Sequence, residues 1–363
     1  MSSIGIDAVG IGIATAVLTI FLLVFDIPSG ILADKWSRKG LLIISTFALA
    51  AASLIFGLSN SLPMYIVGEV FYGIFVVATS GTYQAITYDT LKEQGMASKY
   101  SSVIGKAYAL FLVGAGVGNI VGGFIANSFG FRLVFYISII TCLLNALVLI
   151  SLREPKYHKT MGQEKIAKQI GTASRELIKI QLVRTLAIVL TALSVVEIFK
   201  LEFGQLYMFR YVTAPQAIGS LWAAFAFAMA LGSIVAHRFR TRLSTLILLS
   251  TLPLAVMAFV DNKANLALFL VQAVATAALL NQIETRVQEN TPSAVRASVL
   301  SVLSSLGRLV SVPAVLIFGY IFKDYDEIAA VRIVAVVATL ALLYWILASG
   351  RIKDADKPIQ VTG

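Results

Sequence analysis

Gly30-Ile31-Leu32-Ala33-Asp34-Lys35-Trp36-Ser37-Arg38-Lys39 joins two apolar stretches near the start of the chain, and this segment decides the fold. A glycine near the end of an apolar helix lets a neighbouring helix approach closely. An aspartate four residues later can bind an arginine or the N-terminal end of another helix. Three cations in so short a turn mark the cytoplasmic side of a membrane. The segment therefore predicts two membrane-spanning helices joined in the cytoplasm.

The composition of the whole chain is that of an integral membrane protein. Hydrophobic residues make up 58% and charged residues 13%, whereas soluble domains carry about 25% charged residues. The mean hydropathy is +0.86. The net charge of +10 comes from cations in short links between apolar stretches, so we expect no nucleic-acid partner.

The side-chain inventory argues against enzymatic chemistry. The single cysteine, Cys142, excludes an intramolecular disulfide and a cysteine-based metal site. No nucleophile–base constellation or phosphate-binding loop is visible in the sequence. We therefore expect no enzyme activity, no metal and no cofactor.

Apolar stretches long enough to span a bilayer of ~30 Å recur along the chain. Their periodic distribution predicts an all-α membrane protein built as a two-half helical bundle of about eleven transmembrane helices. Basic links alternate with cation-poor links, which places the C-terminus in the cytoplasm and the N-terminus outside. The predicted helices cover residues 8–32, 40–59, 62–87, 104–126, 132–152, 184–206, 216–236, 243–260, 264–284, 298–322 and 328–349.

The polar interval in the middle of the chain is the expected domain boundary. We expect an N-terminal half (1–152), a cytoplasmic linker (153–183), a C-terminal six-helix half (184–350) and a cytoplasmic tail (351–363). The linker is predicted to be an amphipathic helix, with an unstructured tether as the alternative. Its apolar side would carry Ile166, Ile170, Leu177 and Ile178. Residues 29–36 are weakly similar to residues 232–239, which suggests a duplicated half.

The opening segment resembles the loop that follows the second transmembrane helix in the major facilitator superfamily of secondary transporters. The shared residues are Gly30, Leu32, Ala33, Asp34, Lys35, Arg38 and Lys39, and Ser37 stands where the family usually has glycine. Residues 88–93 and 291–301 resemble further family segments. The resemblance implies two helical halves that rock around a central site. Because the loop here follows the first apolar stretch, we expect that the family's first helix is missing, through a late start codon, a fragment or a real loss.

The resemblance also implies a gating latch. In the family, an acidic residue at the end of the fourth helix pairs with the arginine of the signature loop. On that basis Gly30, Asp34, Arg38 and Asp89 would form a latch on the cytoplasmic side. The alternative is a set of solvated loop charges that contributes less than ~1 kcal/mol.

Glycines in the stretch 104–126 resemble a second family motif. Gly105, Gly114, Gly118, Gly122 and Gly123 follow the spacing of a glycine-rich motif that is associated with exporters exchanging substrate for protons. Asn119 replaces the proline of that motif. Close packing of two helices is the alternative role for these small residues.

Charged residues inside the apolar stretches are the best functional candidates, since burying one costs about 2.5–3.5 kcal/mol. Glu197 and Lys200 are three residues apart and share one helix face. They are either an ion pair that permits burial, or a proton-coupling group with its partner. The full set of proton-coupling or cavity candidates is Glu69, Gln84, Glu197, Lys200, Glu202 and Gln205.

The pattern as a whole predicts a secondary transporter of a small organic solute, in a prokaryotic inner membrane. Proton-coupled efflux is the first choice. Proton-coupled uptake is the alternative, and a non-transporting sensor or an inactive remnant is the option from another class. The expected partners are the lipid bilayer, a small-molecule substrate and protons, with the protein monomeric.

Overall fold

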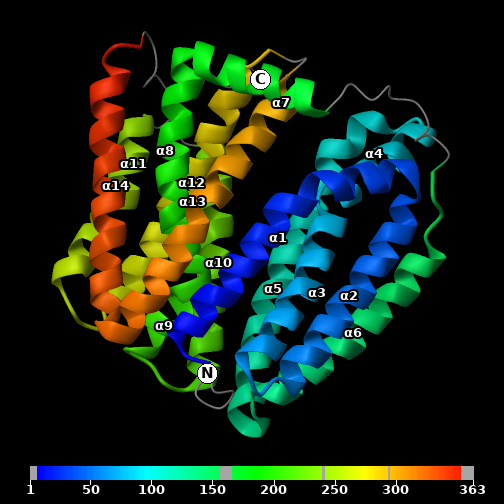
Figure 1. Cartoon of the computed structure of the whole chain (residues 1–363), viewed down its shortest axis with the longest axis horizontal. Coiled ribbons are helices and arrows are strands. Elements are labelled where there is room, and N and C mark those ends of the chain that lie inside the picture. The colour runs from blue at the N-terminus through cyan, green and yellow to red at the C-terminus, as the bar shows by residue number, and fades with distance from the viewer. Residues whose placement is uncertain (1–5, 156–165, 239–241, 293–294, 353–363) are drawn as a thin grey trace. The chain divides into compact units, whose positions relative to one another are not determined.

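The computed structural model of the chain describes residues 6–155, 166–238, 242–292 and 295–352, and every regular element in these ranges is a helix (Figure 1). The first group of α-helices is α1 (Ala8–Lys35), α2 (Arg38–Leu58), α3 (Leu62–Thr79), α4 (Thr82–Glu93), α5 (Tyr100–Phe129) and α6 (Phe131–Ser151). The second group is α7 (Ile166–Lys179), α8 (Gln181–Ile198), α9 (Gly204–Phe209), α10 (Pro215–Arg238), α11 (Leu243–Phe259), α12 (Asn265–Glu289), α13 (Arg296–Asp324) and α14 (Glu327–Ser349).

The helices have the length and composition that a membrane requires. Within the described ranges, 10 spans are long and apolar enough to cross a bilayer. The 17-residue helix α11 is also apolar but falls just below the usual length. The prediction of an all-α membrane protein with about eleven transmembrane helices is confirmed.

The chain divides into two compact units. Unit 1 comprises Met1–Gly162 and Ala214–Ser220, and unit 2 comprises Gln163–Thr213 and Leu221–Gly363. In unit 1, α2 packs against α3 and α6, and α1 packs against α3. In unit 2, α11 packs against α12 and α14 in the same pattern, while α8 packs against α13 and α14.

The segment that decides the fold is more helical than its loop-like sequence suggests. Helix α1 continues through Asp34 to Lys35, and α2 begins at Arg38, so the connecting turn is only Trp36 and Ser37. Ser37 is the N-cap of α2, and its hydroxyl accepts a hydrogen bond from the backbone N–H of Gly40 at 2.8 Å. A serine at this position therefore satisfies one of the free N–H groups of the first turn.

The predicted stretch at 62–87 lies within one candidate span, Leu62–Glu93, but its helix is interrupted between α3 and α4. Gly81 has φ +70°, a left-handed conformation that ends α3 and precedes α4. Val77 lies in the last turn of α3, where carbonyl groups lack partners within the helix. The hydroxyl of Ser29 on α1 donates to the carbonyl of Val77 at 2.8 Å. Helix α1 thus supplies a hydrogen-bond donor to a carbonyl at the end of α3, where the helix no longer continues.

The predicted helix at 184–206 also contains an irregularity. It starts earlier, at Gln181, and residues Phe199–Phe203 form a π-helical turn between α8 and α9. Such turns are rare and occur often at functional sites. This one contains Lys200 and Glu202, two of the candidate residues, and Glu197 precedes it by two positions.

The linker forms a helix, as the amphipathic pattern predicts. In unit 2, α7 packs against α8 and α13, and in Figure 1 it crosses the ends of the upright helices of that unit. Leu177 is buried and Ala173 is fully buried, whereas Ile178 is 60% exposed. The side chains of Ile166 and Ile170 lie outside the described residues.

Candidate functional site

Arg38 and Asp89 meet in unit 1, as the resemblance implies. Arg38 is the first residue of α2, and Asp89 lies in the last turns of α4. The Arg38 guanidinium forms an ion pair and a hydrogen bond with the Asp89 carboxylate, and the two side chains are 13% and 14% exposed. Partial desolvation makes such a charge-assisted bond stronger than one between solvated loop charges.

A second carboxylate joins this end of the unit, and sequence reasoning did not select it. Glu154, just after α6, accepts a hydrogen bond from the backbone N–H of Arg38 at 2.6 Å and from the Ser37 hydroxyl at 2.6 Å. Its negative charge therefore lies at the N-terminus of α2, where the helix dipole favours an anion. The sequence indicates the start of α2, through an N-cap serine before an apolar run, but it does not indicate which carboxylate binds there.

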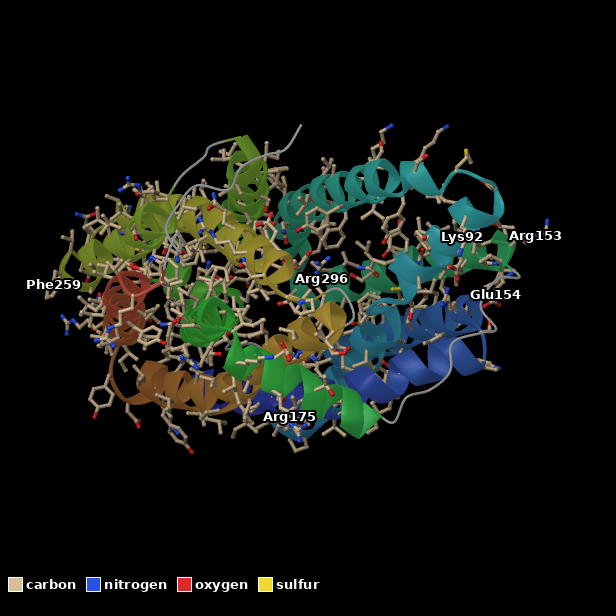
Figure 2. The ribbon with its side chains drawn as sticks, turned by 90° about the horizontal axis from the view of Figure 1, so that it is seen from above. Lys92, Arg153, Glu154, Arg175, Phe259 and Arg296 are labelled. Carbon is tan, nitrogen blue, oxygen red and sulfur yellow. The ribbon has the colours of Figure 1, made fainter. Side chains whose placement is uncertain are left out.

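Lys39 adds a further contact between the start of α2 and the end of α6. Its ammonium group donates to the backbone carbonyl of Ile150, near the end of α6, at 2.7 Å. Figure 2 looks along the helices onto this end and labels Lys92, Arg153 and Glu154 there. The ends of α2, α4 and α6 are thus tied together by Arg38, Asp89, Glu154 and Lys39, which we call the latch cluster.

The other two predicted latch residues precede this cluster in the chain. Gly30 and Asp34 belong to the last turns of α1. The side chain of Asp34 lies outside the described residues, so its part in the latch stays a prediction.

Glu69 and Gln84 do not share one helix. Glu69 is buried on α3 at 9% exposure, and Gln84 is exposed on α4, beyond the break at Gly81. The two residues therefore cannot be assigned to one helical face, as a continuous helix at 62–87 would have allowed. Their roles in a cavity remain predictions.

The glycines of α5 fall into two groups. An added Cβ at Gly105, Gly114 or Gly118 would meet no described atom within 4 Å. At Gly123 it would lie 2.9 Å from the carbonyl oxygen of Pro215, which belongs to the same unit. Gly122 has only the ordinary contact with Val134, at 3.6 Å. Close packing is therefore seen for Gly123 but not for the other four.

Glu197 and Lys200 form a close ion pair inside the span Gln181–Phe209 of unit 2. The Lys200 ammonium lies 2.6 Å from a carboxylate oxygen of Glu197, and the side chains of Lys200 and Glu197 are 1% and 18% exposed. Neither of these two atoms has an aligned hydrogen-bond partner among the described residues. The lysine side chain is therefore enclosed, while the glutamate side chain is partly exposed.

Aromatic rings surround the lysine side of the pair. The Lys200 ammonium lies 5.9 Å from the ring centre of Phe225, which suits a weak cation–π contact. Phe225 stacks on Trp222 at 4.8 Å between centroids and contacts Phe269 at 5.3 Å. Of the remaining candidates, Glu202 is half-buried in the π turn and Gln205 is half-buried in α9.

A separate ion-pair network lies at the C-terminal end of α9, which is the end away from the π turn. Arg210 donates to Asp261 at 3.1 Å and to Glu327 at 2.7 Å. Tyr211 adds a hydrogen bond to Asp261 at 2.9 Å. The hydrogen bond from Arg210, with that from Tyr211, lowers the pKa of the Asp261 carboxyl below its ordinary value. The network joins three segments of unit 2 and was not predicted from the sequence.

With this geometry in place, comparison with known proteins settles the family. The family model described as Major Facilitator Superfamily matches residues 1–315. The chain belongs to this superfamily. The curated relatives are described as transporters, and the candidate spans in the described ranges make this chain a multi-pass membrane protein.

The curated relatives share low sequence identity with this chain over only part of its length. An uncharacterized transporter of Buchnera aphidicola is 30% identical over 164 residues, which are 43% of this chain and 40% of the relative. The aligned region thus spans well under half of that curated relative.

Two solved structures show the same fold. A mutant form of the nucleoside transporter NupG has a TM-score of 0.78 at 15% identity, covering 96% of this chain and 92% of the other. A D-xylose–proton symporter has a TM-score of 0.74 at 14% identity, covering 93% and 87%. At these identities the likeness establishes the fold and leaves the substrate open.

Proposed function

We propose that this superfamily member moves a small organic solute by proton-coupled alternating access, with the Glu197 carboxyl as the proton-carrying group. The observation that carries the proposal is the ion pair between Glu197 and the enclosed Lys200 inside a membrane span. Ionisable groups at this depth are costly and are kept chiefly for function.

The two partners of the pair differ in access, which supports the choice of the carboxyl group. Lys200 is 1% exposed at its side chain, while Glu197 is 18% exposed. A proton can therefore reach Glu197 more readily than it can leave Lys200. Protonation of Glu197 removes the charge that neutralises Lys200, and this favours a conformation in which the lysine finds another environment.

The latch cluster supports the conformational part of the proposal. It holds the ends of α2, α4 and α6 together through charge-assisted bonds that a conformational change can break and remake. Gly30 and Asp34 remain in the proposed latch because of the family resemblance.

The direction of transport has two candidates. Efflux in exchange for protons follows from the glycine-rich motif of α5, whose proline is replaced by Asn119. Uptake together with protons is favoured by the pairing of Glu197 with a cation, and the D-xylose–proton symporter provides a precedent on this fold.

Reconstitution tests the proposal directly. The purified chain is placed in liposomes that contain a pH-sensitive dye, and gradients of uridine, D-xylose and phenylacetate are applied in turn. A proton flux that follows a solute gradient and is abolished in Glu197→Gln supports the proposal. Glu289→Gln, an exposed carboxylate at the end of α12, is the matched control and should behave like the wild type.

Solute flux that does not respond to a proton gradient, or unchanged coupling in Glu197→Gln, would sink the assignment of Glu197. Binding of a solute without any flux would instead indicate a sensor.

A further inference from the structure

We propose that Glu197 and Lys200 form an exchangeable pair: the carboxylate of a small organic anion replaces the Glu197 carboxylate at Lys200, and Glu197 takes up one proton. This inference rests on the proposed function and deepens it. It names the substrate class, an organic anion with an apolar or aromatic body, and the sign of its coupling to protons.

The first argument is the need of Lys200 for a counter-charge. Its side chain is enclosed within a membrane span, and Glu197 is the one carboxylate that forms an ion pair with it among the described residues. A buried ammonium group without a partner is strongly unfavourable. When Glu197 is protonated, an anion bound at Lys200 restores neutrality.

The second argument is the charge that remains in the span when Glu197 takes up a proton. The pair is neutral as it stands, so protonation of Glu197 leaves the positive charge of Lys200. The other charged side chains in the spans packed against α8 are Glu202 in the π turn, Glu284, Arg286 and Glu289 on α12, Arg308, Lys323 and Asp324 on α13, and Glu327 and Arg332 on α14. A site that gains one positive charge favours an anion over a cation.

The third argument is unused hydrogen-bonding capacity. An ammonium group has three donors, yet the Lys200 nitrogen has no aligned hydrogen-bond partner among the described residues. Buried polar atoms are nearly always satisfied, so an exception needs an explanation. A ligand carboxylate, free of the tether of an i,i+3 side chain, can align with these donors better than Glu197 does.

The fourth argument concerns the body of the ligand. Phe225, which faces the Lys200 ammonium, is flanked by Trp222 and Phe269. Flat apolar rings next to a single cation suit an anion whose carboxylate is attached to an apolar or aromatic group.

The exchange has a definite stoichiometry. Without ligand, the site holds one negative charge on Glu197 and one positive charge on Lys200. With ligand, Glu197 carries a proton, and the anion neutralises Lys200. Each bound monoanion therefore brings one proton, the net charge of the site stays zero, and proton and anion travel in the same direction. The inference selects cotransport over exchange.

The test uses phenylacetate as the probe and phenylacetamide, which is nearly isosteric and neutral, as its control. Binding is measured by the shift in thermal unfolding of the purified full chain in detergent. Wild-type affinity for phenylacetate should rise as the pH falls from 7.5 to 5.5. In Glu197→Gln, which mimics the protonated carboxyl, affinity should be about tenfold higher or more and independent of pH. Lys200→Met should lose the response.

Two comparisons keep the outcome clear. Glu289→Gln should behave like the wild type, and Glu197→Gln/Lys200→Met, which removes both charges, should fold but not respond to phenylacetate. Should Glu197→Gln fail to fold, proton uptake by the wild type in weak buffer gives the answer without a variant: one proton per bound phenylacetate is expected. Equal stabilisation by phenylacetamide, absence of phenylacetate binding, or binding without proton uptake would each overturn the inference.

Failure of this inference is distinguishable from failure of the proposed function. Proton-coupled movement of uridine or D-xylose that depends on Glu197, with no binding of phenylacetate, would leave the function intact and remove the anion. Phenylacetate binding with proton uptake, but without flux in liposomes, would support the anion site and contradict the proposed transport function.

Discussion

The carboxylate of Glu154 accepts a hydrogen bond from the backbone N–H of Arg38 at 2.6 Å, while the Arg38 side chain binds Asp89. A single residue at the start of α2 is therefore held by two carboxylates, one from α4 and one from the segment that follows α6. Its backbone is fixed by the residue that follows α6, and its charge is neutralised by α4. This double attachment gives the signature segment a defined orientation in unit 1.

Removing the cap should weaken unit 1. We expect Glu154→Gln to lower the free energy of unfolding by about 0.5–2 kcal/mol, because the first turn of α2 loses a charged acceptor. Thermal unfolding in detergent measures the change. Glu93→Gln, an exposed carboxylate at the end of α4, should have little effect. Equal effects of the two substitutions would contradict the capping role.

The pair between Arg38 and Asp89 should show energetic coupling. In a double-mutant cycle with Arg38→Gln and Asp89→Asn, we expect a coupling of about 1–3 kcal/mol, because both side chains are largely removed from solvent. Unfolding in detergent supplies the four free energies. Additive effects would show that the pair behaves as two solvated charges.

Two glycines of unit 1 should respond in opposite ways to alanine. Gly81→Ala should destabilise the protein by about 1–2 kcal/mol, because φ is +70° there although no described atom lies within 4 Å. Gly105→Ala should stabilise it by about 0.5–1 kcal/mol, because that site is equally open but lies within helix α5. Thermal unfolding of both variants checks the prediction, and a stable Gly81→Ala would argue against the break in the helix.

Asp261 should make stability sensitive to acid. Its pKa is lowered in the folded protein by the hydrogen bonds from Arg210 and Tyr211, so this contribution is complete above the ordinary carboxyl pKa of about 3.9. It is lost as the pH falls below that value and through the lowered one. The unfolding temperature of the wild type should therefore drop more steeply in this range than that of Asp261→Asn. Asp324→Asn, an exposed carboxylate outside the network, should keep the steep wild-type profile.

The sequence alone determined the class of the protein and the approximate positions of the spans, because these depend on composition and on runs of apolar residues. The pairing of Arg38 with Asp89 was expected from the resemblance of short segments to the superfamily. The pairing of Glu197 with Lys200 was also accessible, because residues three apart on a helix are neighbours in any fold.

Only the tertiary structure decided how these residues are held and exposed. Glu154 caps α2 across more than a hundred residues of sequence, and no local pattern indicates such a contact. At the break near Gly81, the Val77 carbonyl accepts a hydrogen bond from Ser29 on another helix. The difference in exposure between Glu197 and Lys200 depends on which helices cover the π turn. In each case the energy comes from groups distant in the chain, so the sequence determines which residues are present and packing determines what each one can do.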